Sequence, residues 1–275
     1  MIYLFLAICS SVGVSIIMRL SAKRAKGSLC MLSANYLMCL LIATAFTGAQ
    51  NAIPAIPGLG QALLLGGING VFYLTSFVIY QRSVAKNGIV LSSTFMKLGL
   101  LVPIAVSIIW EVPTIVQVIG FLIALVGIVL ITGGKDDSAR FSPGLIVLLI
   151  MGGAANAMSE VFEEVGSSDL SSQFLLYTFA AALLLCVVLA ILKKEKPNRY
   201  TLLYGFLIGI PNYFCSRFLL QSLGSLPAVI VYPTYSVATI ITVTLVGVCF
   251  FHERLNRRQW SAVALILASL VLLNL

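Results

Sequence analysis

The sequence predicts an all-α membrane protein with ten transmembrane helices in two inverted five-helix repeats. Three observations predict this fold class. The chain of 275 residues is 60% hydrophobic and only 9% charged, whereas a soluble domain carries about 25% charged residues. The apolar residues fall into runs of about 20, the length that crosses a bilayer. The gaps between these runs are short and hold nearly all the basic residues.

The first five spans follow from the lengths of the apolar runs. Arg19 stands at the end of the first run, Arg82 just beyond the third and Lys135 just beyond the fifth. Trp110 follows the fourth run, at a position typical of an interfacial aromatic residue. The predicted spans are residues 2–19, 28–48, 60–81, 88–109 and 114–132.

The second half of the chain has the same organisation. Lys193 follows the seventh run and Arg254 follows the ninth, while Trp260 lies near the start of the last. No gap between runs is long enough to fold into a separate domain. The predicted spans are residues 144–165, 172–192, 201–223, 228–250 and 258–275.

The basic residues lie almost entirely on one side of the predicted bundle. Of 17 Lys and Arg residues, fifteen lie at the ends of odd spans or the starts of the following even spans. The opposite side has none, and Lys97 and Arg217 fall inside spans. Because cytoplasmic loops carry the excess of Lys and Arg, we expect a multi-pass protein of the plasma (inner) membrane. Both termini are then extracytoplasmic, and the first apolar run is a span and not a removed signal peptide.

The two halves are similar at a shift of roughly 141–143 positions. Gly66-Gly67-Ile68-Asn69 matches Gly209-Ile210-Pro211-Asn212, and Trp110-Glu111 matches His252-Glu253. Each half holds an odd number of spans, so the halves have opposite orientations, an arrangement typical of secondary transporters with a midplane site. The predicted units are a first repeat at 1–134, a cytoplasmic linker at 135–141 and a second, inverted repeat at 142–275.

The loop before the last span carries a resemblance to a known family. Residues 250–260 read Phe-Phe-His-Glu-Arg-Leu-Asn-Arg-Arg-Gln-Trp. This stretch resembles the G-E-R/x-L-x-x-x-Q/x loop of the ten-helix EamA-like branch of the drug/metabolite transporter superfamily, with His252 where Gly is usual. The resemblance covers the whole chain in architecture. It implies a transporter that exports amino acids or related metabolites through a cavity lined by spans one, three, four, six, eight and nine. Many members are thought to keep their termini in the cytoplasm, and the charge distribution predicts the reverse here.

Lys97 is the most informative single residue of the sequence. A charge in hydrocarbon costs about 3 kcal/mol on insertion scales. At about 1.5 Å per residue, Lys97 lies about 13 Å above the cytoplasmic end of its span, near the middle of a ~30 Å core. We expect a cavity-facing ammonium that holds a carboxylate or phosphate, or that takes part in coupling. The alternative is a structural ion pair inside the bundle.

Arg217 and Glu160 form a second predicted feature. Both lie about 24 Å above the cytoplasmic ends of their spans. A buried Arg requires a carboxylate partner, so we expect a gate or ion pair between them, with Glu163 and Glu164 as alternative partners. Proton exchange through Glu160 is a further alternative.

Uncharged polar side chains at midspan complete the candidate site. Hydroxyls and amides in lipid must find partners, so helix–helix bonding is the alternative role for each one. Ser10, Ser11 and Ser93 share this midspan position. The predicted substrate-binding residues, besides Lys97, are Asn69, Tyr73, Thr94, Asn156, Asn212, Tyr213, Tyr232 and Tyr235.

The sequence offers no basis for catalysis, a cofactor or a metal. The one histidine, His252, has no second ligand nearby, and the six cysteines lie in apolar runs without a C-x-x-C spacing. A P-loop is absent, which argues against ATP-driven pumping. We therefore expect no enzyme activity, no cofactor and no nucleic-acid partner. The expected partners are a small-molecule substrate and the lipid bilayer, and the chain is a monomer or a homodimer.

The function predicted from these features is secondary active or facilitative transport of a small polar metabolite, with export as the default direction. The solute is an amino acid or a related anionic or zwitterionic compound, carried by alternating access around a midplane cavity. The alternative is a lipid or lipid-phosphate flippase on the same fold, in which Lys97 and Arg217 would bind a phosphate headgroup.

Overall fold

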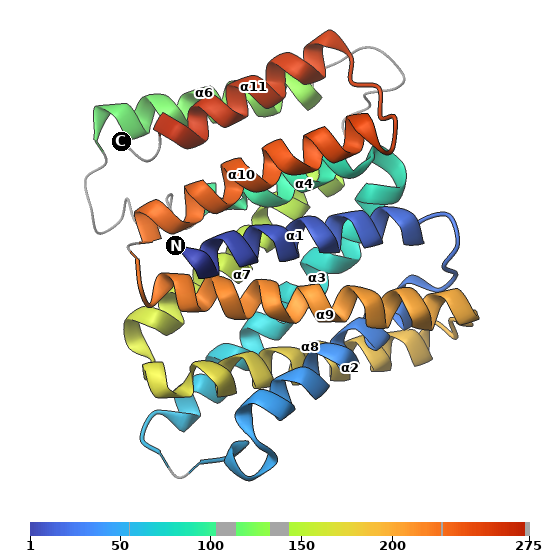
Figure 1. The fold of residues 1–275 in the computed structure, drawn as a ribbon, viewed down its shortest axis with the longest axis vertical. Coiled ribbons are helices and arrows are strands. Elements are labelled where there is room, and N and C mark those ends of the chain that lie inside the picture. Colours follow the sequence, from blue (N-terminus) through green and yellow to red (C-terminus); the bar gives the residue numbers. More distant parts are fainter. Residues whose placement is uncertain (55, 103–113, 133–142, 227, 273–275) are drawn as a thin grey trace.

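The computed structural model describes residues 1–54, 56–102, 114–132, 143–226 and 228–272, and the regular elements within these ranges are all helical (Figure 1). Three short 3₁₀ helices, η1 (Ala49–Asn51), η2 (Leu98–Leu100) and η4 (Ser168–Leu170), accompany the α-helices. The α-helices are α1 (Ile2–Ser21), α2 (Ser28–Thr47), α3 (Leu59–Asn87), α4 (Ile89–Lys97), α6 (Ile115–Thr132), α7 (Pro143–Val165), α8 (Ser171–Leu192), α9 (Arg199–Leu223), α10 (Ala228–Cys249) and α11 (Arg257–Leu272).

Each predicted span contains one of these α-helices, and most boundaries agree within two residues. Helix α3 is longer than predicted, because it continues through Arg82 and Lys86 to Asn87. The fourth span departs from the prediction, since α4 ends at Lys97 and a 3₁₀ helix at Leu98–Leu100 interrupts the α-helix expected over 88–109. Residues 103–109 of this span lie outside the described residues. The linker at 135–141 lies outside the described residues, as does the Trp110-Glu111 pair.

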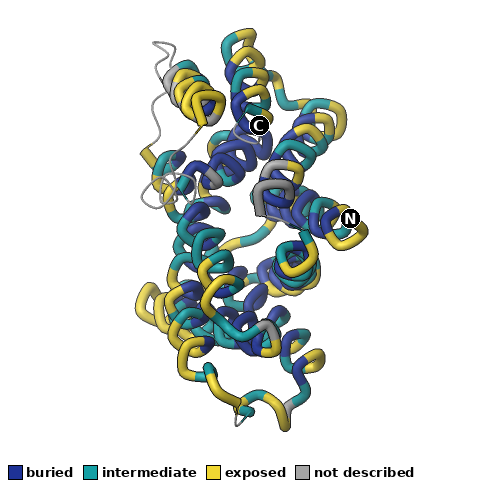
Figure 2. The backbone as a smooth tube through the Cα atoms, turned by 90° about the vertical axis from the view of Figure 1, so that its left-hand side faces the viewer, coloured by how far each residue is buried: buried dark blue, intermediate teal, exposed yellow. Residues whose placement is uncertain are grey.

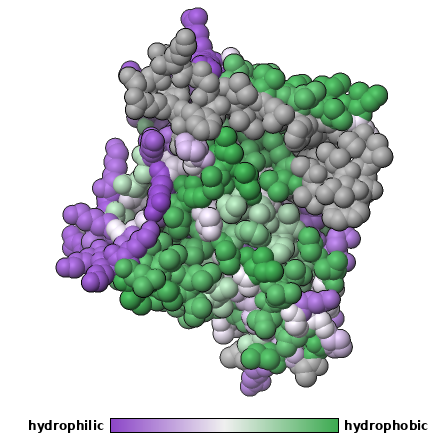
Figure 3. Space-filling model, turned by 180° about the vertical axis from the view of Figure 1, so that it is seen from behind, coloured by the Kyte–Doolittle hydropathy of each residue, from purple (hydrophilic) through white to green (hydrophobic). Residues whose placement is uncertain are grey.

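Five of the described helices, α1, α2, α3, α7 and α8, are long and apolar enough to cross a membrane. Large hydrophobic side chains such as Leu63, Leu184 and Leu192 point outward and are more than half exposed. Figure 2 shows exposed positions along the outer sides of the helices and buried ones between them. Figure 3 shows a broad apolar face whose hydrophilic side chains gather mainly at one edge. An apolar exterior of this kind suits lipid as the surrounding solvent.

The helices pack in a layered arrangement around the middle of the molecule. Helix α1 packs against α9 and α10, while α3 packs against α7 and α8. Helix α2 contacts α8 and α9, α4 contacts α7 and α10, and α6 pairs with α11 at one edge of the molecule (Figure 1). The N- and C-terminal ends of the described chain lie at the same end of the bundle in this view.

Glycines allow the closest of these helix contacts. A Cβ atom on Gly66 would lie 2.9 Å from the Phe174 carbonyl oxygen of α8, and one on Gly205 would lie 2.5 Å from the Met31 carbonyl oxygen of α2. Gly67, in contrast, faces open space. Small residues at helix interfaces let backbones approach closely in lipid, where hydrophobic burial no longer drives association. This close packing places the polar positions of α3 and α9 against the centre of the bundle.

Candidate functional site

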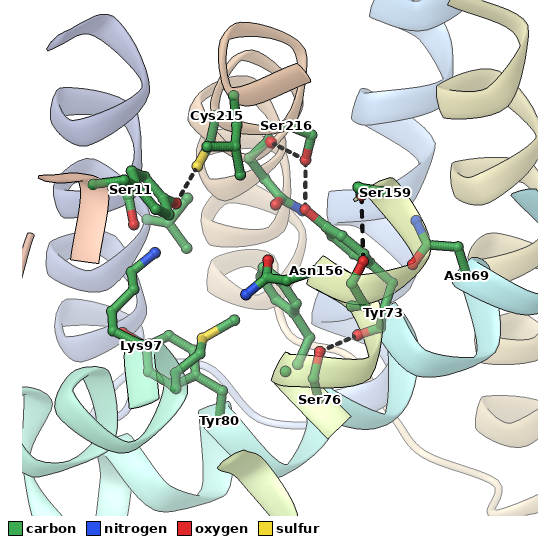
Figure 4. Close-up of a pocket in the computed structure, with 18 of the residues that line it drawn as sticks. Ser11, Asn69, Tyr73, Ser76, Tyr80, Lys97, Asn156, Ser159, Cys215 and Ser216 are labelled. Atoms are coloured by element: carbon green, nitrogen blue, oxygen red, sulfur yellow. Dashed lines mark hydrogen bonds between the residues drawn. The ribbon is translucent and has the colours of Figure 1, made fainter. Parts of the chain in front are cut away.

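A cavity of about 80 Å³ lies in the middle of the bundle, at the position expected for the site (Figure 4). Side chains from α1, α3, α4, α7, α8, α9 and α10 line it. These elements include the six spans named in the sequence analysis, together with Leu175 of α8. The predicted residues that line the cavity are Asn69, Tyr73, Lys97, Asn156, Asn212 and Tyr235, and Ser11 and Ser93 join them.

Lys97 is buried at the end of α4, with 8% of its surface exposed. Its ammonium nitrogen lies 3.7 Å from the centroid of the Tyr235 ring, a cation–π distance. Figure 4 shows the amine pointing across the cavity wall toward Ser11. Within the described residues no carboxylate lies within ion-pair distance of this amine. The predicted alternative of a structural ion pair therefore finds no partner in this part of the chain.

Hydroxyl and thiol groups form the wall next to Lys97. The Tyr73 hydroxyl shares a hydrogen bond with the Ser216 hydroxyl, and the Ser76 hydroxyl donates to the Tyr73 carbonyl oxygen at 2.9 Å. The Tyr235 hydroxyl lies 2.9 Å from the Cys215 sulfur. These bonds fix α3 and α9 relative to each other, and α9 relative to α10, so the aromatic rings hold defined positions.

Three asparagines supply the amide groups of the cavity. The Asn212 amide nitrogen donates to the Asn35 side-chain oxygen at 3.1 Å, which ties α9 to α2. The Asn69 amide nitrogen donates to the Thr178 hydroxyl at 3.4 Å, but its side-chain oxygen is buried without a hydrogen-bond partner. The Asn156 side chain lines the cavity from α7. A buried acceptor without a partner costs about 1–3 kcal/mol, so Asn69 is suited to receive a hydrogen bond from a solute.

A cluster of hydroxyls closes one end of the cavity. The Tyr80 hydroxyl lies 2.8 Å from the hydroxyls of both Ser15 and Ser93. Below it, the Ser83 and Ser92 hydroxyls lie 2.8 Å apart. These two layers join α1, α3 and α4 at the end of the bundle that carries the basic loops. At the opposite end the lining reaches Leu223, the last residue of α9.

Glu253 lies beneath these layers and binds three groups at once. Its carboxylate accepts hydrogen bonds from the backbone N–H groups of Ile89 at 2.9 Å and Val90 at 3.3 Å. It also pairs with Arg19, whose guanidinium nitrogen lies 3.2 Å away. A carboxylate at a helix N-terminus binds unpaired N–H groups and complements the helix dipole. The resembling loop motif thus has a structural role here, as the N-terminal cap of α4.

Two backbone positions permit this cap. Gly88 has a φ of +84°, and a Cβ atom there would lie 2.6 Å from the Glu253 carboxylate oxygens. His252 has a φ of +51°, in the left-handed region that glycine adopts most readily. This conformation explains why Gly is usual at that position of the resembling loop.

Glu195 makes a comparable contact in the loop between α8 and α9. Its carboxylate accepts from the backbone N–H of Leu29 at 2.8 Å and of Cys30 at 3.3 Å, at the start of α2. The two carboxylates therefore tie loops of the second half of the chain to helix starts of the first half. Both contacts lie at the end of the bundle where the basic loops are found.

Three predicted site residues lie outside the cavity lining. Thr94 is fully buried and its hydroxyl donates to the Val90 carbonyl oxygen at 2.8 Å, because it is one residue past Ser93 and faces another side of α4. Tyr213 faces α2 and stacks on Phe46, with ring centroids 5.9 Å apart. Tyr232 supports the wall indirectly, since its hydroxyl donates to the Asn156 carbonyl oxygen at 3.1 Å.

The expected pair of Arg217 and Glu160 is absent among the ion pairs of the described residues. Arg217 donates instead to the Tyr213 hydroxyl at 3.0 Å, and its guanidinium lies 4.3 Å from the centroid of the Phe46 ring. Helical geometry explains the difference. Arg217 lies one turn beyond Tyr213 on the side of α9 that faces α2, whereas Glu160 belongs to α7.

Several lining residues were not singled out from the sequence. They continue helical faces that the predicted residues had already marked, at spacings of three, four or seven. On α3 the face of Asn69 and Tyr73 continues through Ser76 and Tyr80, and on α9 the face of Asn212 continues through Cys215 and Ser216. The remaining polar additions are Ser15 and Ser159. Helical periodicity, applied to each predicted residue, would have identified most of them.

Three comparisons with known proteins are consistent with a membrane transporter. An uncharacterized protein of Haemophilus influenzae is 23% identical over 209 residues, which cover 73% of this chain and 72% of that protein. A solved crystal structure aligns with a TM-score of 0.62 at 17% identity, covering 98% of this chain and 94% of the other, and so shares the fold. The model of the EamA-like transporter family matches residues 143–275. This match confirms, for residues 143–275, the resemblance to the EamA-like branch of the drug/metabolite transporter superfamily seen in the loop before the last helix.

Proposed function

We propose that this protein is a secondary active or facilitative transporter of a small anionic or zwitterionic metabolite. The observation that carries the proposal is the buried ammonium of Lys97, which faces a central cavity and has no carboxylate partner among the described residues. An unpaired cation inside a membrane protein is costly. A solute carboxylate beside Lys97 would offset that cost, while the hydroxyls and amides of the lining orient the rest of the solute.

Two inverted repeats would give this site alternating access. The contact pattern supports such a repeat, because exchanging each helix for its counterpart five spans along the chain maps contacts onto contacts. The pair α1–α9 becomes α7–α3, α2–α9 becomes α8–α3, and α1–α10 becomes α7–α4, and all six pairs are in contact. The pairs α2–α8, α4–α10 and α6–α11 map onto themselves. Rocking of one repeat against the other around a fixed midplane site is the expected transport motion.

The arrangement favours a state that is closed at the end with the basic loops. Tyr80, Ser15 and Ser93 seal the cavity there, and Arg19 and Glu253 form a further contact beneath them. With the basic loops in the cytoplasm, the sealed end is the cytoplasmic one, and both termini are extracytoplasmic in the plasma (inner) membrane. Export would then require these contacts to break so that the solute enters from the cytoplasmic side.

Ligand-dependent melting of the purified protein tests the site. The melting temperature is recorded against amino acids, hydroxy acids, nucleosides, sugar phosphates, organic cations and lipid phosphates, for the wild type and Lys97→Ala. A ligand at a hundred times its Kd adds about 2.7 kcal/mol to the folded state, which gives a measurable shift. We expect small anionic or zwitterionic solutes to stabilise the wild type but not the variant, and the same solutes to be transported into liposomes.

Lys86→Ala is the matched control, because Lys86 is an exposed lysine in the last turn of α3. It should retain every ligand shift that Lys97→Ala loses. Stabilisation by lipid phosphates alone would favour the flippase and contradict the proposal. Equal shifts in the wild type and Lys97→Ala would show that Lys97 does not bind the solute.

A further inference from the structure

The charges of the residues that line the cavity limit the net charge that a bound solute can carry. Among the described residues that line it, Lys97 is the one charged side chain, and none is a carboxylate. Glu160 and Glu163 lie further along α7 and are not part of the lining. A monoanion bound at Lys97 would leave the site electrically neutral. A zwitterion would neutralise Lys97 and add a second ammonium that has no counter-charge.

The aromatic rings of the lining do not provide an obvious second cation site. One face of Tyr235 is already occupied by the Lys97 ammonium. Tyr73 stacks on Phe77, with centroids 5.4 Å apart, and meets the edge of Phe179. A buried charge without a partner costs several kcal/mol. The described lining therefore disfavours the ammonium of an amino acid.

Uncharged polar groups lie across the cavity from Lys97. Figure 4 shows the Asn156 amide in the middle of the view, facing the Lys97 amine, and Asn69 farther across, beyond Tyr73. The buried side-chain oxygen of Asn69 is an acceptor without a partner, and the Asn156 amide can both donate and accept. A hydroxyl group on the solute matches both, because it donates one hydrogen bond and accepts others without bringing a charge.

The size of the cavity limits the solute to a few carbon atoms. Its volume is about 80 Å³, whereas cavities for drug-sized ligands measure about 300–1,000 Å³. We propose that the solute is a small hydroxylated monocarboxylate, with its carboxylate at Lys97 and its hydroxyls at Asn69 and Asn156. This inference rests on the proposed function, and it separates such hydroxy acids from the amino acids that share their carbon skeleton.

Three compounds with one skeleton test the charge argument. Glycerate is a monoanion, serine is a zwitterion and glyceramide is neutral, while all three carry hydroxyl groups. The Kd of each is measured with the purified full chain by isothermal titration, for the wild type, Lys97→Ala, Lys97→Arg and Lys86→Ala. We expect glycerate to bind the wild type at least tenfold more tightly than serine or glyceramide. Lys97→Ala should abolish this preference, and Lys97→Arg should retain part of it because the positive charge remains.

A comparison of glycerate with propionate tests whether the solute hydroxyls contribute to binding. Propionate lacks both hydroxyls of glycerate, so the wild type should bind it at least tenfold more weakly. Asn69→Leu should reduce that difference at least threefold while leaving propionate binding unchanged, and the remaining difference reflects the hydroxyl at Asn156. The melting temperature of each unliganded variant shows that it is folded. Equal affinity for propionate and glycerate in the wild type would overturn the assignment of hydroxyls to Asn69.

The outcomes distinguish this inference from the proposed function. If serine binds as tightly as glycerate and both depend on Lys97, the monocarboxylate class is wrong and the transporter site stands. If none of the three compounds binds, but another small anion binds in a Lys97-dependent manner, the solute class is again wrong. If glycerate binds equally to the wild type and Lys97→Ala, the role of Lys97 fails and the proposed site fails with it.

Discussion

Two basic side chains that point into the bundle, the half-buried Arg19 and the buried Lys97, are stabilised in different ways. Arg19 forms an ion pair with Glu253 and donates to the Val84 carbonyl oxygen at 3.0 Å. Lys97 has a ring face in place of a carboxylate, since its ammonium lies over Tyr235. A cation–π contact is worth about 2 kcal/mol when desolvated, which is less than the cost of burying the charge. The charge of Lys97 is therefore only partly compensated and can still bind an anion in the proposed mechanism. The charge of Arg19 is already compensated by Glu253.

Replacement of Tyr235 tests this account of Lys97. Tyr235→Leu removes the ring, whereas Tyr235→Phe removes only the hydroxyl that contacts Cys215. We expect Tyr235→Leu to lower the free energy of unfolding by about 1–2 kcal/mol more than Tyr235→Phe, through loss of the cation–π contact. Denaturant titration in detergent measures both values.

A double-mutant cycle with Lys97→Met isolates that contact from the space left by the smaller side chain. Without the ammonium, the extra cost of Tyr235→Leu should fall to the cost of the lost volume alone. The same additional destabilisation in both backgrounds would mean that the ring stabilises the fold only through packing.

At the level of single residues, six of the nine predicted substrate-binding residues line the cavity, whereas the other three face neighbouring helices or their own helix. Asn69, Tyr73 and Lys97 were recognisable because a polar group inside an apolar run needs a partner. Thr94 satisfies that need within its own helix, and Tyr213 satisfies it with Arg217 on α9. Whether a polar residue faces a cavity or a neighbouring helix depends on the helix packing, which one sequence does not specify.

At the basic end, carboxylates from the second half of the chain cap the N-termini of two helices of the first half. Glu253 caps α4 and Glu195 caps α2, and both carboxylates come from loops of the second half. A hydrogen bond to a charged group contributes about 1.5–3 kcal/mol. Because Glu253 lies directly beneath the hydroxyl layers of the cavity, its cap of α4 stabilises the closed state in the proposed mechanism.

Glu253→Gln should therefore favour opening at the basic end. The change removes the ion pair with Arg19 and weakens the cap of α4. A cysteine placed at Ser92, which is fully buried between the cavity and Glu253, reports on opening in a background whose native cysteines are replaced. A loss of about 1.4 kcal/mol of closed-state stability would raise the maleimide reaction rate at this cysteine about tenfold.

Glu195→Gln is the matched control, because it weakens a similar cap on α2 away from the cavity floor. It should leave the reactivity of the cysteine at position 92 within about twofold of the parent, well below a tenfold effect. Equal acceleration by both substitutions would indicate general loosening of the bundle and would remove Glu253 from the gating mechanism.

Element positions were predictable to the extent that apolar length determines them. A bilayer requires about 20 apolar residues per helix, and this requirement identified the helices and most of their ends. The end of α4 at Lys97 was not predictable from length, because the apolar run continues beyond it. The cap at Gly88 was also hidden, since Glu253 is more than 160 residues away in the chain.

At the scale of the whole molecule, a partly repeated pattern of helix contacts accompanies a strong asymmetry of charge. The contacts α1–α9, α2–α9 and α1–α10 recur in the other half as α7–α3, α8–α3 and α7–α4, yet the basic loops lie at one end, opposite the termini (Figure 1). Weak sequence similarity suggested the repeat only through short stretches such as that of Asn69 and Asn212. The charge distribution has no bearing on the fold itself, but it predicts how the fold is inserted in the membrane.

Cysteine labelling in intact cells tests that insertion. Single cysteines replace exposed residues at the two ends, in a background without native cysteines: Lys23 and Lys194 at the basic end, Gln50 and Asp169 at the opposite end. Because Lys and Arg are retained in the cytoplasm, we expect a membrane-impermeant maleimide to label positions 50 and 169 and to spare 23 and 194 until the cells are permeabilised. The reverse pattern would place the termini in the cytoplasm and make the sealed end the extracytoplasmic one. Labelling of all four positions in intact cells would show insertion in both orientations, and a single cytoplasmic entry side for export would then have to be abandoned.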